Sequence, residues 1–113
     1  MTKFWIEDRN NPGKREWLLD RLHQQTEDYK YKDYPIVARF LVPDTDQFVV
    51  VAAGIGRGGT VAAGEFLVDE HRMDELLKQI PRDWQKKNIE VVLETQVIQG
   101  RSGPPRVRAV HVW

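Results

Sequence analysis

The residues best suited to chemistry are the glycines that follow the apolar stretch 48–53. The pattern G-x-G-x-x-G, the fingerprint of dinucleotide-binding loops, is matched by Gly54-Ile55-Gly56-Arg57-Gly58-Gly59. In such loops, free backbone N–H groups at the start of a helix bind a phosphate, and an arginine adds positive charge. The sequence therefore offers a candidate nucleotide- or phosphate-binding site, which consists of Gly54, Gly56, Arg57, Gly58, Gly59 and Thr60.

One part of the dinucleotide fingerprint is missing. The fingerprint requires an acidic residue at the end of a second parallel strand, about 20 residues after the glycines. At that distance this chain has Asp74, which lies within a predicted helix. The missing residue therefore favours a second interpretation of the loop 54–60, in which it is a strand-to-helix turn without a ligand. The sequence requires no cofactor, and a nucleotide is the alternative that the loop suggests.

The sequence does not bring together a catalytic set. Ser102 is its only serine, and a hydrolase triad needs a serine held against an oriented histidine. The histidines lie in separate predicted elements: His23, His71 and His111. No catalytic residue is predicted, and the sequence favours a non-enzymatic protein without excluding an enzyme.

Two pairs of acidic residues in the sequence are explained by structure without a catalytic role. Glu90 and Glu94 share one face of a predicted strand and lie about 13 Å apart, too far for a retaining glycosidase pair. We expect both to face solvent. Asp44 and Asp46 flank a turn, and turn formation explains them. No motif for a metal site is present, so no metal ligand is predicted.

The elements around the loop are predicted by hydrophobic periodicity. Residues 36–42 alternate between two faces, residues 48–53 are apolar throughout, and the short link 43–46 makes them an antiparallel hairpin. Because the second strand lacks polar alternation, we expect it to be central and covered on both faces. A second antiparallel hairpin is predicted from residues 89–97 and 106–113.

Two helices are predicted after the glycines. Thr60 suits the N-cap of the first helix, and Asp69 starts the second. The second helix has a buried face and ends at Pro81; the face consists of Met73, Leu76, Leu77 and Ile80.

The N-terminal part is less regular. Residues 4–6 predict a short strand, residues 10–13 a turn, and residues 17–22 either a strand or a helix. The predicted fold is α/β, with α+β as the alternative. It is a single domain spanning residues 1–113, with a mixed sheet, two antiparallel hairpins and two helices after the glycine-rich turn.

Composition limits the function classes. The chain has 113 residues, 41% of them hydrophobic and 30% charged, which fits one globular domain. The balance of 17 basic and 17 acidic residues argues against direct binding of nucleic acid. The longest apolar run, residues 48–55, is too short to cross a bilayer, and the N-terminus lacks the apolar core of a signal peptide. A cytoplasmic protein without membrane attachment is expected.

Four segments resemble an uncharacterised bacterial module found mainly in acidobacterial proteins. They are FWIEDRNNPGKREW, DYPIVARF, FVVVAAGIGRGGTVAAGEFL and WQKKNIEVVLETQVIQGRSGPPRVRAVHVW. The resemblance implies the C-terminal part of a larger Rossmann-like module, which follows a DNA-binding winged helix or other signalling parts and has no established activity. It also implies a looser loop pattern, G-x-x-x-x-G-T, in which Gly54, Gly59 and Thr60 are the meaningful positions. A preceding strand present in the family is missing here, and dimerisation would cover the edge left open.

The sequence thus leads to two hypotheses of different classes. The first is a non-enzymatic sensory or protein-interaction domain, which contacts a protein partner or associates with itself as a homodimer. The alternative is a nucleotide- or phosphate-binding domain that uses the loop 54–60.

Overall fold

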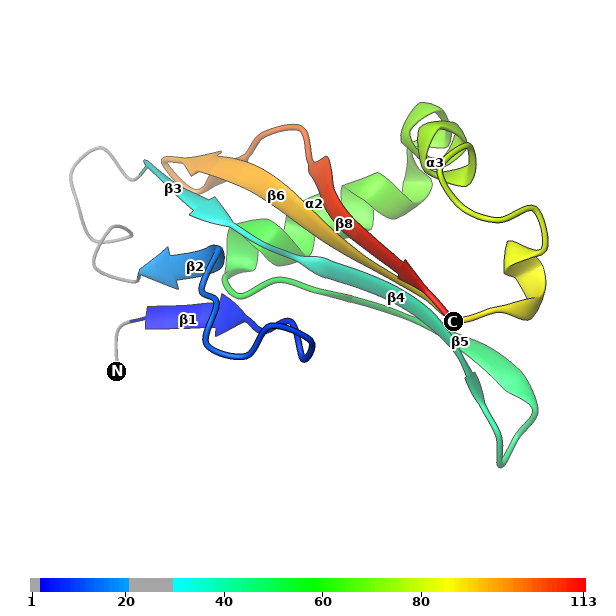
Figure 1. The fold of residues 1–113 in the computed structure, drawn as a ribbon. Helices are drawn as coiled ribbons and strands as arrows, with labels where there is room; N and C mark the ends of the chain where they lie inside the picture. Colours follow the sequence, from blue (N-terminus) through cyan, green and yellow to red (C-terminus); the bar gives the residue numbers. More distant parts are fainter. Residues whose placement is uncertain (1–2, 21–29) are drawn as a thin grey trace.

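The main feature of the fold is a twisted antiparallel sheet with two helices packed on one face (Figure 1). The computed structural model describes residues 3–20 and 30–113, apart from the side chains of Phe4, Leu19 and Asp20. The strands of this sheet are β3 (Lys30–Asp33), β4 (Ile36–Val42), β5 (Gln47–Ala53), β6 (Ile89–Ile98), β7 (Arg101–Ser102) and β8 (Arg106–Val112). The helices are α2 (Arg57–Val68), α3 (Glu70–Leu77) and the 3-10 helix η1 (Trp84–Lys86).

All strand pairs within the described residues are antiparallel, so the fold is α+β. The α+β alternative is confirmed, whereas the α/β label and the mixed sheet expected from the sequence do not hold. The reason is the route of the chain after α2. It passes through α3 and η1 before it enters β6, which then runs antiparallel to β4.

Strand β6 is the centre of the sheet. On one side it pairs with β4 through residues 89–92 and with β3 through residues 95–98. On its other side it pairs with β8 and β7. Both predicted hairpin pairings are confirmed, since β4 pairs with β5 and β6 pairs with β8 in antiparallel register.

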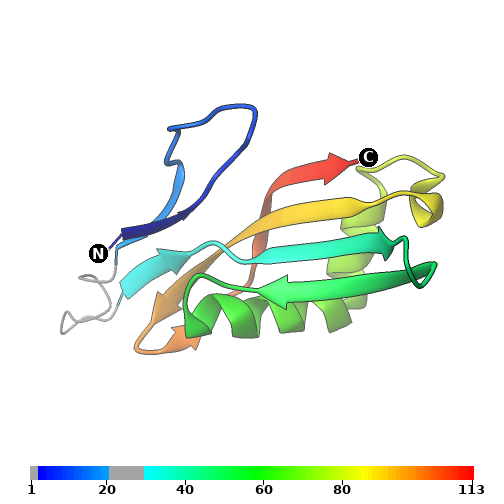
Figure 2. The same ribbon diagram turned by 90° about the horizontal axis from the view of Figure 1, so that it is seen from below.

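Strand β5 lies at the edge of the sheet, where its only strand neighbour in the described chain is β4 (Figure 2). The prediction of a central, covered strand is wrong. Its large apolar side chains are exposed: Phe48 by 37%, Val49 by 37%, Val50 by 54% and Val51 by 41%. A continuous apolar run usually means burial on both faces, so this strand departs from the rule that its sequence suggests.

The core lies between the sheet and the helices. The central strands contribute Val37, Val91 and Leu93, and α2 contributes Ala63 and Phe66. The predicted apolar face of the second helix is confirmed, since Leu76 and Ile80 are buried and Met73 and Leu77 pack against the same core. Helix α3 ends at Leu77, before the predicted end at Pro81. None of the described helices is long and apolar enough to cross a membrane.

The start of the first helix differs from the prediction, while the start of the second agrees with it. Helix α2 begins at Arg57 after the N-cap Gly56, so Thr60 lies in its first turn and is not the N-cap. Arg57, Gly58 and Gly59 form the first turn of the helix together with Thr60, whose hydroxyl bonds back to Gly54 and Gly56. Asp69 caps α3 by accepting a hydrogen bond from the Arg72 backbone N–H, as its position at the helix start predicts.

A separate hairpin forms the N-terminal part. Its strands are β1 (Lys3–Ile6) and β2 (Trp17–Asp20), and in Figure 2 it lies on the side of the main sheet opposite α2. The predicted strand at residues 4–6 is confirmed, and residues 17–19 adopt the strand alternative. Leu22 and His23 lie outside the described residues.

Candidate functional site

The glycine-rich loop after β5 closes around the carboxylate of Asp33. Asp33 ends β3 and is completely buried. Its oxygens accept four backbone N–H groups: Oδ1 from Tyr34 (2.8 Å) and Ile55 (3.0 Å), and Oδ2 from Gly56 (2.8 Å) and Gly59 (2.9 Å). A carboxylate of the chain itself thus takes the place that a phosphate occupies in a nucleotide-binding loop.

The glycines of the loop are explained by close approach of other atoms. A Cβ at Gly59 would overlap the Asp33 carboxylate, and a Cβ at Gly54 would overlap the backbone of Thr60. At Gly58 a Cβ would overlap the Val97 side chain of β6. Gly54 and Gly59, two of the three glycine positions of the G-x-G-x-x-G match, therefore have a structural cause within the fold.

Thr60 completes the closed loop. Its Oγ1 accepts a hydrogen bond from the Gly54 N–H (2.9 Å) and donates to the Gly56 carbonyl (3.3 Å). Arg57 is exposed at the start of α2. The six predicted ligand-binding residues lie together, but the N–H groups of Gly56 and Gly59 already bind Asp33. Ligand binding here stays a prediction.

Sequence reasoning missed Asp33. It lies in a polar stretch just before Tyr34-Pro35, and no local pattern distinguishes it from the neighbouring charged residues. Its partners follow 22 to 26 residues later, and the approach depends on the pairing of β3 with β6 and on the position of α2 below the sheet. Only the tertiary structure connects the carboxylate with the glycines.

A second polar cluster surrounds Glu94 of β6. The expectation that Glu94 faces solvent is wrong, because the residue is buried and both carboxylate oxygens are engaged. Oε1 lies 3.3 Å from Lys32 Nζ and accepts from the Tyr34 hydroxyl at 3.4 Å, while Oε2 accepts from Arg108 at 3.3 Å. Burial raises the pKa of Tyr34, and the negative charge of Glu94 raises it further. Glu90 is half-buried.

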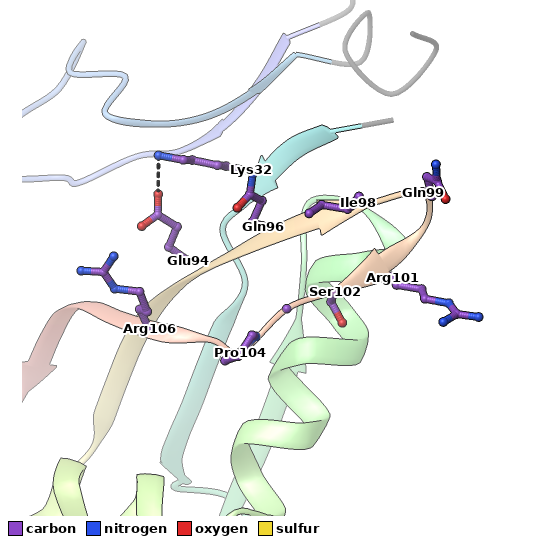
Figure 3. A pocket seen from close by; sticks show the side chains of 10 residues that line it. Lys32, Glu94, Gln96, Ile98, Gln99, Arg101, Ser102, Pro104 and Arg106 are labelled. Atoms are coloured by element: carbon purple, nitrogen blue, oxygen red, sulfur yellow. Dashed lines mark ion pairs between the residues drawn. The ribbon is translucent and has the colours of Figure 1, made fainter. Parts of the chain in front are cut away.

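This cluster borders a surface pocket that Figure 3 shows from close by. Lys32 and Glu94 face each other across neighbouring strands, and the pocket also includes Gln96, Arg106 and Ser102. Neither of the two histidines in the described residues, His71 of α3 and His111 of β8, is among its lining residues. Because the Glu94 carboxylate is paired with Lys32 and Arg108, it is not available as a free base. We interpret the cluster as a set of ion pairs that holds β3, β6 and β8 together.

The outer edge of β5 is the third candidate, and the hydrogen bonds of β4 show how its backbone is oriented. The Leu93 N–H donates to the Pro35 carbonyl (2.8 Å), and the Leu41 N–H donates to Asn88 Oδ1 (2.7 Å). Pro35 and Leu41 thus turn their backbone groups toward β6. Because these groups alternate along an antiparallel strand, Phe40 and the other even-numbered residues of β4 turn theirs toward β5.

The register then identifies the open groups of β5. Phe40 lies opposite Val49, and Ala38 lies opposite Val51, so Val49 and Val51 bond to β4. The N–H and C=O groups of the alternate residues point away from the sheet: those of Phe48, Val50 and Ala52. No other strand of the described chain lies on that side.

The side chains of β5 add an apolar surface to this edge. The strand Gln47–Ala53 contains no charged residue. The Phe48 ring is held in place by Arg39, whose guanidinium carbon lies 3.7 Å from the ring centroid. Arg39 is itself fixed by the carbonyls of Gln85 and Lys87. The edge is therefore a rigid apolar strand with open backbone groups.

We compared the chain with protein-family models, curated proteins and solved structures, and none of these comparisons found a match. The resemblance to a bacterial module stays a prediction.

Proposed function

We propose that the chain is a non-enzymatic protein-interaction domain that binds its partner through the outer edge of β5. The observation that supports this proposal is the combination of open backbone groups and exposed apolar side chains on one strand. An exposed, apolar edge strand is a template for pairing with another strand, and proteins that do not use such an edge normally protect it with charges, proline or a bulge. Strand β5 has none of these protections.

The mode of recognition that fits this edge is strand addition. An extended segment of the partner would bond to the backbone of Phe48, Val50 and Ala52, and this pairing would supply affinity independent of sequence. Specificity would come from the side chains that alternate on the two faces of the strand. Phe48 and Val50 lie on the face that α2 covers in part, while Val49 and Val51 lie on the opposite face.

The alternative function, binding of a nucleotide or phosphate by the loop 54–60, has less support. A phosphate would have to displace the Asp33 carboxylate from the N–H groups of Gly56 and Gly59. That carboxylate is buried, and its negative charge would repel an approaching anion. The interaction edge needs no such rearrangement.

Selection of displayed random peptides tests the proposal. The domain is immobilised at low density, so that its copies stay apart, beside a Val50→Pro variant that has lost the open N–H at the centre of the edge. We expect the wild-type domain to enrich extended peptides with alternating β-branched or aromatic residues. The dissociation constant of these peptides should be at least about tenfold higher for the variant. Equal binding to both proteins, or enrichment of peptides without this pattern, would argue against β5 as the contact element.

A further inference from the structure

We infer that the partner of β5 is a second copy of the same chain, paired antiparallel about a two-fold axis that passes beside Val50. This inference rests on the proposed function, since it names the partner of the same edge. The backbone pattern of the strand, the sizes of its side chains and the charges at its two ends all fit this pairing.

The backbone pattern is complementary to itself. In an antiparallel pair, residues that exchange two hydrogen bonds both turn their N–H and C=O groups toward the partner strand. A two-fold axis beside Val50 places Val50 opposite Val50 of the second copy, and Phe48 opposite Ala52. Each of the three outward residues therefore meets another outward residue, and the sheet continues from one copy into the next.

Neighbouring registers are less favourable. A shift by one residue places outward groups opposite groups that already bond to β4. A shift by two residues keeps the alternation, but it places one outward residue opposite a position outside the strand, either Asp46 or Gly54. Only the register about Val50 uses Phe48, Val50 and Ala52 together.

The side chains fit this register. The large Phe48 lies opposite the small Ala52 of the second copy, Val50 lies opposite Val50, and Val49 lies opposite Val51. Pairs of β-branched residues and pairs of large with small residues pack well across antiparallel strands. Because the strand has no charged residue, the two-fold axis brings no like charges together.

Charges beyond the ends of the strand favour a second copy over an unrelated peptide. The register places the turn 43–46 of each copy beside residues 54–57 of the other. The turn contains Asp44 and Asp46, while Arg57 lies exposed at the positive N-terminal end of α2. Among the described ion pairs none involves these three residues. The symmetry repeats this attraction at both ends of the interface.

A charge-pair experiment tests both the interface and its register. Sedimentation equilibrium is measured for the wild-type chain, for Val50→Lys, for Val50→Glu and for an equimolar mixture of the two variants. We expect a concentration-dependent wild-type dimer and at least a tenfold higher dissociation constant for either variant alone, because two like charges then face each other. In the mixture, opposite charges face each other and the dimer should return.

The matched control is Val68→Lys, which places the same charge on α2 at a side chain that is 82% exposed. It should dimerise as the wild type does, and circular dichroism of every variant reports whether the fold is kept. A wild-type chain that stays monomeric at high concentration would overturn the inference, as would a dimer that both Val50 variants leave intact or a mixture that fails to recover it. Enrichment of β-type peptides by a strictly monomeric wild-type domain would refute the second copy while supporting the proposed function.

Discussion

Strand β5 and the loop 54–60 are consecutive in the chain, yet their backbone groups point in opposite directions. The loop turns the N–H groups of Ile55, Gly56 and Gly59 inward, where the buried Asp33 carboxylate accepts all of them. The strand turns the groups of Phe48, Val50 and Ala52 outward, where no strand of the described chain meets them. A glycine pattern therefore does not by itself mark a binding site. The direction of the open backbone groups is the better guide.

The two regions also differ in energy. A buried N–H without a partner costs roughly 1–3 kcal/mol, so the loop depends on Asp33 for its stability. The outward groups of β5 are at the surface, where water satisfies them at little cost. Loss of the internal partner should therefore unfold the loop, while changes at the outer edge should affect association more than the stability of the monomer.

The largest effect is expected for Asp33→Asn. The substitution replaces one acceptor oxygen by an amide donor, and this donor would face the N–H groups of Gly56 and Gly59 or of Ile55. We expect the free energy of unfolding to fall by roughly 2–4 kcal/mol, measured by urea denaturation in dilute solution. Asp44→Asn, at an exposed turn residue, is the control and should change it by less than about 0.5 kcal/mol. If the two variants were equally stable, the Asp33 contacts would not hold the loop.

Proline substitutions on β5 distinguish the N–H groups that bond to β4 from those that point outward, because only the first should cost much stability. Val49→Pro removes an N–H that bonds to β4, and we expect a loss of roughly 2–3 kcal/mol of unfolding free energy. Val50→Pro removes an outward N–H, and the loss for the monomer should stay below about 1 kcal/mol. Thermal or urea unfolding in dilute solution gives both values. A larger loss at Val50 than at Val49 would reverse the assigned alternation.

The smallest effect is expected from the pair of α2 variants Gly59→Ala and Gly64→Ala. The new Cβ at position 59 would overlap the Asp33 carboxylate, and we expect a loss of roughly 1–3 kcal/mol of unfolding free energy. Gly64 is exposed in the same helix and has no atom near the new Cβ, so alanine should stabilise the domain by roughly 0.5–1 kcal/mol through helix propensity. Equal effects at both positions would show that Asp33 does not restrict residue 59.

Much of the fold could be predicted from local patterns. The alternation in 36–42 and 89–97 identified the strands, and the spacing of Met73, Leu76 and Ile80 identified the buried face of α3. The sheet position of β5 could not be predicted, because an apolar run has the same appearance whether both faces are buried or a partner covers it later. Patterns within one element do not show which element lies beside it.

The candidate site was harder to predict than the fold. The glycines of the loop were recognised, but their partner Asp33 lies on another strand and approaches them only through the folded sheet. The prediction that Glu94 faces solvent was wrong for a related reason: its burial is compensated by Lys32, far earlier in the sequence, and by Arg108 on the paired strand β8. Long-range polar contacts decide both regions, and periodicity within a segment does not reveal them.

Residue-resolved amide hydrogen exchange in dilute solution distinguishes the inward N–H groups of the loop from the outward N–H groups of β5. The account predicts slow exchange for the N–H groups of Gly56 and Gly59 and for those of Val49 and Val51, because each has a partner within the chain. It predicts fast exchange at Phe48, Val50 and Ala52, and protection of these three amides as the protein concentration rises. Fast exchange at Gly56 and Gly59, or slow exchange at Val50 in the dilute monomer, would contradict the account.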